Sequence, residues 1–172
     1  MERSVSVSDL AAKFTLACAL VACGSPPPGS VGGDEQPAID LEACARGDSS
    51  CTKLDDPSKV TAVESLAPGS GHALLLEKGG GIRAPLLAPD GKQHLSHLVV
   101  GLHTLGTEGQ PRQLQIAIDD GMPAILGEAI VPGFGRIEIA ELGNRYVAGM
   151  PVTIRCTEGS FELVYVVGRW DP

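Results

Sequence analysis

The chain has 172 residues, with 22 glycines and 13 prolines against one Trp, two Tyr and three Phe. This length suffices for one hydrophobic core, and this composition favours many turns and short strands over a helical bundle. The 13 basic and 21 acidic residues give a formal net charge of -8 and form no basic cluster, so the electrostatic footprint of a nucleic-acid-binding surface is missing.

The N-terminal segment predicts a signal peptide over residues 1–22. Arg3 and Lys13 precede an uncharged run at positions 14–22. Nine residues of helix rise about 14 Å, whereas a membrane span requires roughly 20 residues. The run is therefore typical of the apolar core of a signal peptide and not of a transmembrane helix.

The apolar run ends at Leu20, Val21, Ala22 and Cys23. These four residues resemble the lipobox of bacterial lipoprotein signal peptides. The resemblance implies that the Cys23 thiol carries diacylglycerol, that the chain is cut before Cys23, and that its new amino group is acylated. Two or three acyl chains on one residue make a stable membrane anchor, whereas a single chain holds a protein only marginally.

Two further features bear on the N-terminus. The residue after Cys23 is Gly24. In bacterial lipoproteins an Asp at this position tends to retain the protein at the inner membrane, so Gly24 resembles the signal for sorting to the outer membrane of the cell envelope. The alternative is an ordinary signal peptide cut after Ala17-Cys18-Ala19. The GSPPPGS tract that follows Cys23 directly favours the lipoprotein, because this composition is typical of a tether.

We expect residues 24–57 to form a flexible linker that reaches about 30 Å on average. Within it, six residues separate Cys44 from Cys51. Extracytoplasmic compartments permit disulfides, and Gly47 would help to bring the two Cα atoms to the ~5.5 Å that a bridge requires. We therefore predict a Cys44–Cys51 disulfide. The alternative, a metal–thiolate pair, would want further ligands nearby, and no histidine lies within twenty residues of Cys51.

From Val60 onward, short apolar alternations recur about every ten residues and end in Gly, Pro or Asp. The clearest run places Leu114, Ile116 and Ile118 on one face of a strand. This pattern predicts an antiparallel sandwich or barrel. The expected strands cover residues 60–66, 72–76, 81–87, 94–105, 113–119, 124–131, 135–142, 151–157 and 161–169. Asp56-Pro57 would alternatively begin a short helix.

The order and type of these strands resemble an immunoglobulin-like sandwich. Residues 66–74 and 88–102 are also similar to uncharacterised bacterial surface lipoproteins, a resemblance that implies no activity. We therefore expect residues 58–172 to form an all-β, immunoglobulin-like antiparallel β-sandwich of about eight or nine strands. The disulfide of antibody domains is missing, because no second cysteine is placed to bridge the sheets with Cys156.

The densest group of polar side chains contains His94 and His97, followed by His103. On a regular strand His94 and His97 point to opposite faces, while His97 and His103 share a face about 20 Å apart. One metal ion cannot bind all three in that geometry. We predict no metal and no cofactor, and a ligand- or metal-binding module that uses the His94/His97 region is the alternative function.

Other candidate groups have simpler interpretations. Strand alternation places Cys156 on the inner face as a buried thiol, with exchange toward Cys44 or Cys51 as the alternative. Asp119-Asp120 fits a hairpin turn, and Glu138 fits a solvated strand face. Sugar recognition would need exposed aromatic rings, which the sequence offers only near Tyr165 and Trp170.

The sequence contains no Gly-x-Ser-x-Gly, no His-Glu-x-x-His, and no Ser-x-x-Lys followed by the companion motifs of the penicillin-binding class. We therefore predict that the protein is not an enzyme. The expected function is that of an envelope lipoprotein, held at the membrane by Cys23, whose β-sandwich serves protein interaction or a structural role with unknown envelope proteins as partners.

Overall fold

The computed structural model describes residues 34–66, 71–121, 124–126, 132–140 and 142–172. Cys23, the predicted signal peptide and residues 24–33 of the predicted linker lie outside these ranges. The strands are β1 (Glu35–Pro37), β2 (Thr52–Asp55), β3 (Val60–Glu64), β4 (His72–Glu77), β5 (Gly80–Pro85), β6 (His94–Thr104), β7 (Gln113–Ile118), β8 (Ala124–Leu126), β9 (Gly133–Ile139), β10 (Pro151–Glu158) and β11 (Ser160–Asp171). One α-helix, α1 (Leu41–Arg46), and two 3-10 turns, η1 (Pro57–Lys59) and η2 (Gly143–Arg145), complete the described elements.

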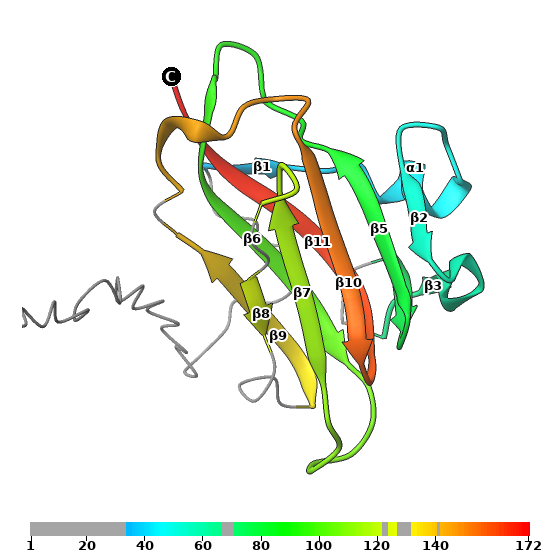
Figure 1. Ribbon diagram of the computed structural model, residues 1–172. Helices are drawn as coiled ribbons and strands as arrows, with labels where there is room; N and C mark the ends of the chain where they lie inside the picture. The colour runs from blue at the N-terminus through cyan, green and yellow to red at the C-terminus, as the bar shows by residue number, and fades with distance from the viewer. Residues whose placement is uncertain (1–33, 67–70, 122–123, 127–131, 141) are drawn as a thin grey trace, which may run out of the picture.

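The strands form two facing sheets (Figure 1). A six-stranded sheet has the order β3-β4-β11-β6-β9, with β1 added beside the second half of β11. A five-stranded sheet has the order β2-β5-β10-β7-β8. Every strand pair among the described residues is antiparallel. The predicted antiparallel β-sandwich is confirmed, and each of the nine predicted strands overlaps a described strand, although residues 127–131 of the predicted strand 124–131 lie outside the described ranges.

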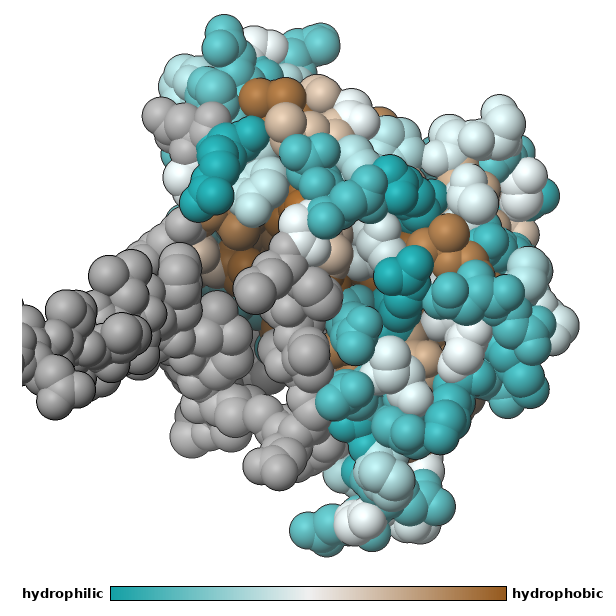
Figure 2. All heavy atoms as spheres, viewed as in Figure 1, coloured by the Kyte–Doolittle hydropathy of each residue, from teal (hydrophilic) through white to brown (hydrophobic). Residues whose placement is uncertain are grey.

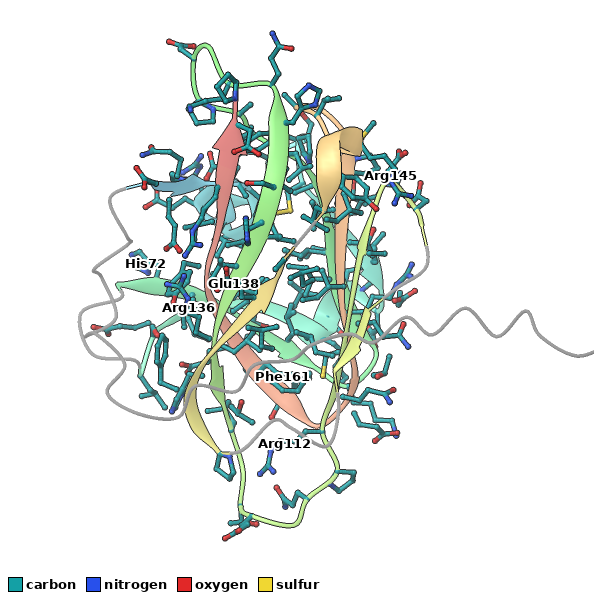
Figure 3. All side chains as sticks on the ribbon, turned by 90° about the vertical axis from the view of Figure 1, so that its left-hand side faces the viewer. His72, Arg112, Arg136, Glu138, Arg145 and Phe161 are labelled. Atoms are coloured by element: carbon teal, nitrogen blue, oxygen red, sulfur yellow. A yellow bond between two sulfur atoms is a disulfide. The ribbon has the colours of Figure 1, made fainter. Side chains whose placement is uncertain are left out.

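Alternating apolar residues fill the space between the sheets. Leu114, Ile116 and Ile118 are buried while the intervening residues of β7 are partly exposed, as the sequence predicts. Figure 3 shows Phe161 between the two layers, where it is fully buried. The largest side chains of this core are Phe161, Leu74, Leu76, Ile82, Leu86, Leu95, Leu98, Leu102, Leu114, Ile116, Ile154 and Leu163.

The predicted flexible linker is wrong from residue 35 onward. Residues in this stretch form β1, α1 and β2, and the two strands extend the two sheets. Ala38 and Ile39 are 0% and 3% exposed and join the core. Because these side chains belong to the core, the folded unit includes β1, α1 and β2 and does not begin at residue 58.

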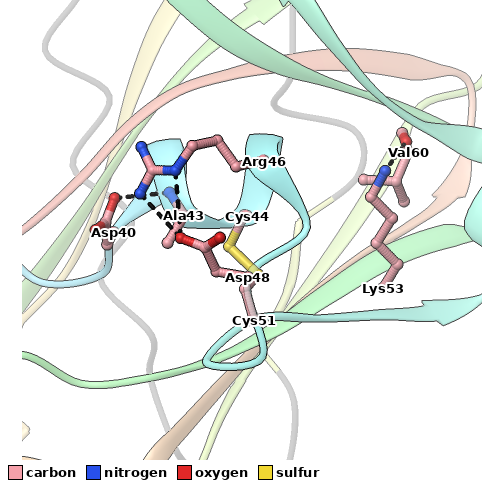
Figure 4. Close-up of a disulfide and its surroundings, with 8 residues drawn as sticks. All are labelled: Asp40, Ala43, Cys44, Arg46, Asp48, Cys51, Lys53 and Val60. Carbon is pink, nitrogen blue, oxygen red and sulfur yellow. Dashed lines mark hydrogen bonds and ion pairs between the residues drawn. A yellow bond between two sulfur atoms is a disulfide. The ribbon is translucent and has the colours of Figure 1, made fainter.

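Helix α1 has only six residues, yet it has a capping residue at each end. The Asp40 side chain accepts a hydrogen bond of 2.9 Å from the Ala43 amide, and Gly47 ends the helix at φ 77°. Glycine tolerates this left-handed conformation without a steric penalty. The helix carries Cys44, which a disulfide joins to Cys51 with a Cα–Cα separation of 5.0 Å (Figure 4). This is the pair that the sequence predicts.

Two β-bulges change which side chains face outward. Ser96 has no Cα partner on β11, and Val164 has none on β6. An extra residue in one strand interrupts the alternation of side chains. As a result Val164 and Tyr165 both lie on the side away from the core, where Val164 packs with Ala73 in a small separate cluster.

Candidate binding site

The candidate site is the outer face of the six-stranded sheet, the side turned away from the core. Of the five described aromatic residues, Phe161 and Trp170 are buried in the core and Tyr146 packs against it. Phe134 and Tyr165 instead lie on this outer face and pack against Val164 and its cluster. Their ring centroids are 6.3 Å apart with a 51° tilt, a favourable arrangement for two aromatic rings. We call Phe134 and Tyr165 the aromatic pair.

Strand register surrounds the aromatic pair with polar side chains. The outward positions of β9, β6 and β11 form three successive rows, which are Phe134, His103 and Glu162; Arg136, Gly101 and Tyr165; and Glu138, Val99 and Val167. Figure 3 shows Arg136 and Glu138 projecting from this side of the molecule. One sheet face thus combines aromatic rings with arginine, carboxylate and imidazole groups.

Gly101 makes room for the Tyr165 ring. A Cβ atom at position 101 would lie 2.4 Å from the ring atoms Cε1 and Cζ, so the ring occupies the space above the glycine. Burial raises the pKa of Tyr165, and the hydrogen bond and positive charge of Arg136 offset part of that rise. The phenol is therefore neutral at physiological pH and lies beside a guanidinium group.

The buried carboxylate of Glu162 lies at one edge of this outer face and holds neighbouring groups in place. The Glu162 side chain is 5% exposed, and its Oε2 atom lies 3.1 Å from His103 Nδ1. The same oxygen accepts a 3.1 Å hydrogen bond from the Leu66 amide, which ties the chain after β3 to the face. Leu66 itself is 68% exposed.

A second group, which we call the charged network, consists of Glu35, Arg136, Glu138, Arg169 and His97. The Glu35 carboxylate receives both guanidinium nitrogens of Arg136, one of them at 3.2 Å, and Arg169 Nη2 at 3.2 Å. Arg169 Nη1 also lies 3.4 Å from Glu138, whose Oε1 atom is 4.0 Å from His97 Nε2. Burial lowers the pKa of Arg136, but the hydrogen bond and charge of Glu35, together with the charges of Tyr165 and Glu138, raise it above its usual value.

The charged network crosses two outward-facing valines. Arg136 belongs to β9 and Glu35 to β1, and these strands lie on opposite sides of the β6–β11 pair. Their contact must therefore pass above Val99 and Val167. Strand alternation points both valines outward, yet they are 0% and 3% exposed. Glu138, expected as a solvated residue, is part of this network and not a free surface group.

The histidines are only partly as expected. The bulge at Ser96 breaks the regular alternation, so His94 and His97 both fall on the outer side and not on opposite faces. His97 and His103 share that side, as predicted. The described part of the chain contains no cluster of three His, Cys, Asp or Glu side chains that would hold a metal ion.

The remaining predicted site residues have structural roles. Cys156 is 1% exposed and unpaired, and burial raises the pKa of its thiol to about 12. The predicted buried thiol is confirmed. Asp119 and Asp120 adopt φ values of 55° and 51° in the turn after β7, and Asp120 forms a bidentate ion pair with Arg83 at 2.7 Å.

Among the described residues, the outer face of the five-stranded sheet has a different character. Figure 2 views the molecule from the side of the five-stranded sheet, where hydrophilic residues predominate outside the grey region and hydrophobic ones appear in small groups. Its outward side chains include Gln113 and Thr157, which hydrogen-bond each other at 2.7 Å. The described aromatic rings that face away from the core therefore gather on the six-stranded sheet. No described helix is long and apolar enough to span a bilayer.

Sequence comparison and fold comparison give different results. No protein-family model matches the chain, and no curated protein matches it. In fold, the chain is similar to the C-terminal CBM6 of LamC, a marine laminarinase from Zobellia galactanivorans. The TM-score is 0.51 at 11% identity, over 78% of this chain and 98% of that chain. Identity this low shows the shared β-sandwich fold alone.

Two further solved structures are similar at lower scores. An exo-β-1,3-galactanase from Phanerochaete chrysosporium has a TM-score of 0.49 at 10% identity and is covered over 30% of its length by 70% of this chain. A family 6 carbohydrate-binding module has a TM-score of 0.48 at 9% identity, over 71% of this chain and 95% of that chain.

Proposed function

We propose that the protein is a lipid-anchored, non-catalytic binding module of the cell envelope that binds a saccharide through the outer face of the six-stranded sheet. Cys23 carries the acyl chains at the outer membrane, and the β-sandwich is displayed outside the cytoplasm. The saccharide takes the place of the envelope proteins expected as partners from sequence alone. The proposal that the module is not an enzyme rests on the missing hydrolase motifs.

One observation carries the choice of ligand. The chain has six aromatic residues, and two of the described ones lie on an outer sheet face although large apolar rings normally favour the core. The Tyr165 ring offers an apolar surface with a hydroxyl at its edge, and Arg136, Glu138 and His103 supply hydrogen-bonding groups around it. A sugar ring presents the matching combination of C–H groups and hydroxyls. The neighbour named as a CBM6 has the same fold, which suits this use.

The ligand is tested by affinity electrophoresis of the full chain in gels that contain neutral polysaccharides or isolated envelope glycans. We expect at least one glycan to retard the wild type and Tyr165→Ala to lose the retardation. Gln115→Ala, on the outer face of the other sheet, is the matched control and should behave as the wild type. Retardation that persists in Tyr165→Ala, or a wild type that binds only envelope proteins, would contradict the proposal.

The anchor needs a separate experiment. Cells that express the full chain are grown with labelled palmitate, and their membranes are then separated by density. We expect label on the wild type and the protein in the outer-membrane fraction, and neither for Cys23→Ser. Cys18→Ser is the matched control, because it removes the other cysteine of the same segment and should leave labelling unchanged. A Cys23→Ser variant that stays in the membrane and keeps its label would overturn the anchor.

A further inference from the structure

The Glu35 carboxylate lies on the outer face of the six-stranded sheet, in a position formed by arginine side chains from other strands. Its side chain is 2% exposed, although β1 is a three-residue strand paired with β11 alone among the described strands. A carboxylate this deeply buried is uncommon unless ionic partners hold it. These partners, Arg136 and Arg169, come from β9 and β11.

Both arginines present the geometry that recognises a carboxylate. Arg136 contacts both Glu35 oxygens with its two terminal nitrogens, which is the bidentate arrangement of a planar guanidinium group. Arg169 adds a third contact at 3.2 Å. The two arginine side chains remain 31% and 42% exposed, so the pair can be reached from solvent beside the carboxylate.

The segment that carries Glu35 makes few strand contacts with the rest of the sheet. β1 makes three residue pairs with β11, and Pro37 has no amide hydrogen to donate. Firm attachment begins at the next residue, because Ala38 is fully buried and its amide donates a 2.9 Å hydrogen bond to Val166. Release of Glu35 would therefore involve only the few residues before Ala38.

The carboxylate site is continuous with the aromatic pair. Arg136 lies in the same row as Tyr165 and interacts with its phenol. A sugar placed against the Tyr165 ring would thus have its substituents within the range of the guanidinium that now holds Glu35.

We propose that Arg136 and Arg169 form a binding site for the carboxylate of an acidic saccharide, and that Glu35 occupies this site when no ligand is bound. This inference rests on the proposed function and names its ligand class as a saccharide that contains uronic acid. Glu35 is part of the same chain and competes at a high effective concentration, so it lowers the apparent affinity of the ligand in proportion to its occupancy.

The test is isothermal titration of the full chain, purified in detergent, with tetragalacturonate and with its fully methyl-esterified form. We expect Glu35→Gln, which keeps the shape but removes the competing charge, to bind tetragalacturonate at least tenfold more tightly than the wild type. Binding of the neutral ester should change less than twofold. Adding Arg169→Met to Glu35→Gln should abolish the gain.

Two control variants keep the result specific. Glu158→Gln removes an equal charge from the exposed ion pair with Lys78 and should leave both affinities unchanged. Glu35→Asp keeps the charge on a shorter side chain and should give a smaller gain than Glu35→Gln, and thermal melts establish that each variant is folded. Unchanged or weaker tetragalacturonate binding by Glu35→Gln, or an equal gain in Glu158→Gln, would overturn the inference. Absence of tetragalacturonate binding in every variant overturns it too, while the proposed function stands or falls on the neutral glycans and Tyr165→Ala.

Discussion

The ring of Tyr165 lies directly above Gly101, and this contact between β11 and β6 shapes the outer face of the six-stranded sheet. A methyl group at position 101 would come within 2.4 Å of the ring, far closer than carbon atoms approach without strain. The glycine is thus required by its neighbour on the next strand and not by its own backbone conformation.

Gly101→Ala should therefore displace the Tyr165 ring. Forcing a methyl group into this contact should lower the free energy of unfolding by about 1–3 kcal/mol and weaken saccharide binding. Urea titration and affinity electrophoresis measure the two effects. Gly135→Ala is the control, because a Cβ at that position on β9 meets no atom within 4 Å. Equal behaviour of the two variants would show that the ring is not held as described.

The disulfide should contribute a measurable part of the stability. Cys44 and Cys51 are separated by 7 positions, and closing a loop of that length stabilises a fold by about 2–3 kcal/mol in the chain-entropy model. We expect the unfolding midpoint in urea to fall when reductant is added to the Cys156→Ala variant, in which no other described cysteine reacts. A Cys44→Ser/Cys51→Ser variant should be insensitive to reductant, and reductant effects that persist in it would contradict this assignment.

Glu162 should be more important to stability than the exposed ion pairs. Glu162→Ala leaves the Leu66 amide and His103 without their shared acceptor, and an unmatched buried polar group costs about 1–3 kcal/mol. Glu162→Gln keeps one acceptor oxygen and should lose less. Lys78→Ala breaks a surface pair whose side chains are 64% and 41% exposed, so its effect should stay below about 1 kcal/mol. Urea unfolding of the three variants gives the order, and a larger loss in Lys78→Ala would refute it.

Cys156 should be inert in the native protein. Its thiol has a pKa raised to about 12, mainly by burial, so iodoacetamide at pH 8 should not modify it until the chain unfolds. Because the folded state raises the pKa of Cys156, the thiol ionises at a lower pH in the unfolded chain than in the folded one. The protonated Cys156 thiol therefore contributes fully to the free energy of unfolding below pH 9, and this contribution declines as the pH rises toward 12. Tyr165, whose pKa is also raised, adds a loss in the same direction.

Mass spectrometry after alkylation with and without denaturant measures the reactivity of Cys156. Urea titrations between pH 8 and 11 should then show a shallower alkaline loss of stability in Cys156→Ala than in the wild type. Rapid modification of the native thiol at pH 8 would be incompatible with its buried position.

The strands were predictable because their signal is local. The nine expected runs are short, rich in apolar residues and closed by Gly, Pro or Asp. The clearest of them, Leu114 to Ile118, alternates apolar and polar residues as a half-buried strand does. β1 and β2 are not predicted by the sequence, because three and four residues are too few to show the two-residue alternation of a strand. Helix α1 offered Asp40 and Gly47 as end signals, but six residues are also too short for helical periodicity to be seen.

The binding face was only partly predictable, because its contacts join residues far apart in the chain. The sequence indicated Tyr165 as a position for sugar recognition, but Trp170 is buried in the core. Glu35 belongs to a stretch whose composition is typical of a flexible linker, and its partners Arg136 and Arg169 are 101 and 134 residues away. The bulges at Ser96 and Val164 depend on pairing with another strand, and no local pattern revealed them.

The inclusion of β1, α1 and β2 in the folded unit limits how far the domain can travel from an anchor at Cys23. If Cys23 is fixed in the bilayer, ten residues separate it from Asp34, and the chain between them spans at most about 40 Å when fully extended. The module would then search a thin shell of solvent next to the lipid headgroups. Glycans within that shell would meet it at a high local concentration, and those farther away would have to approach the membrane first.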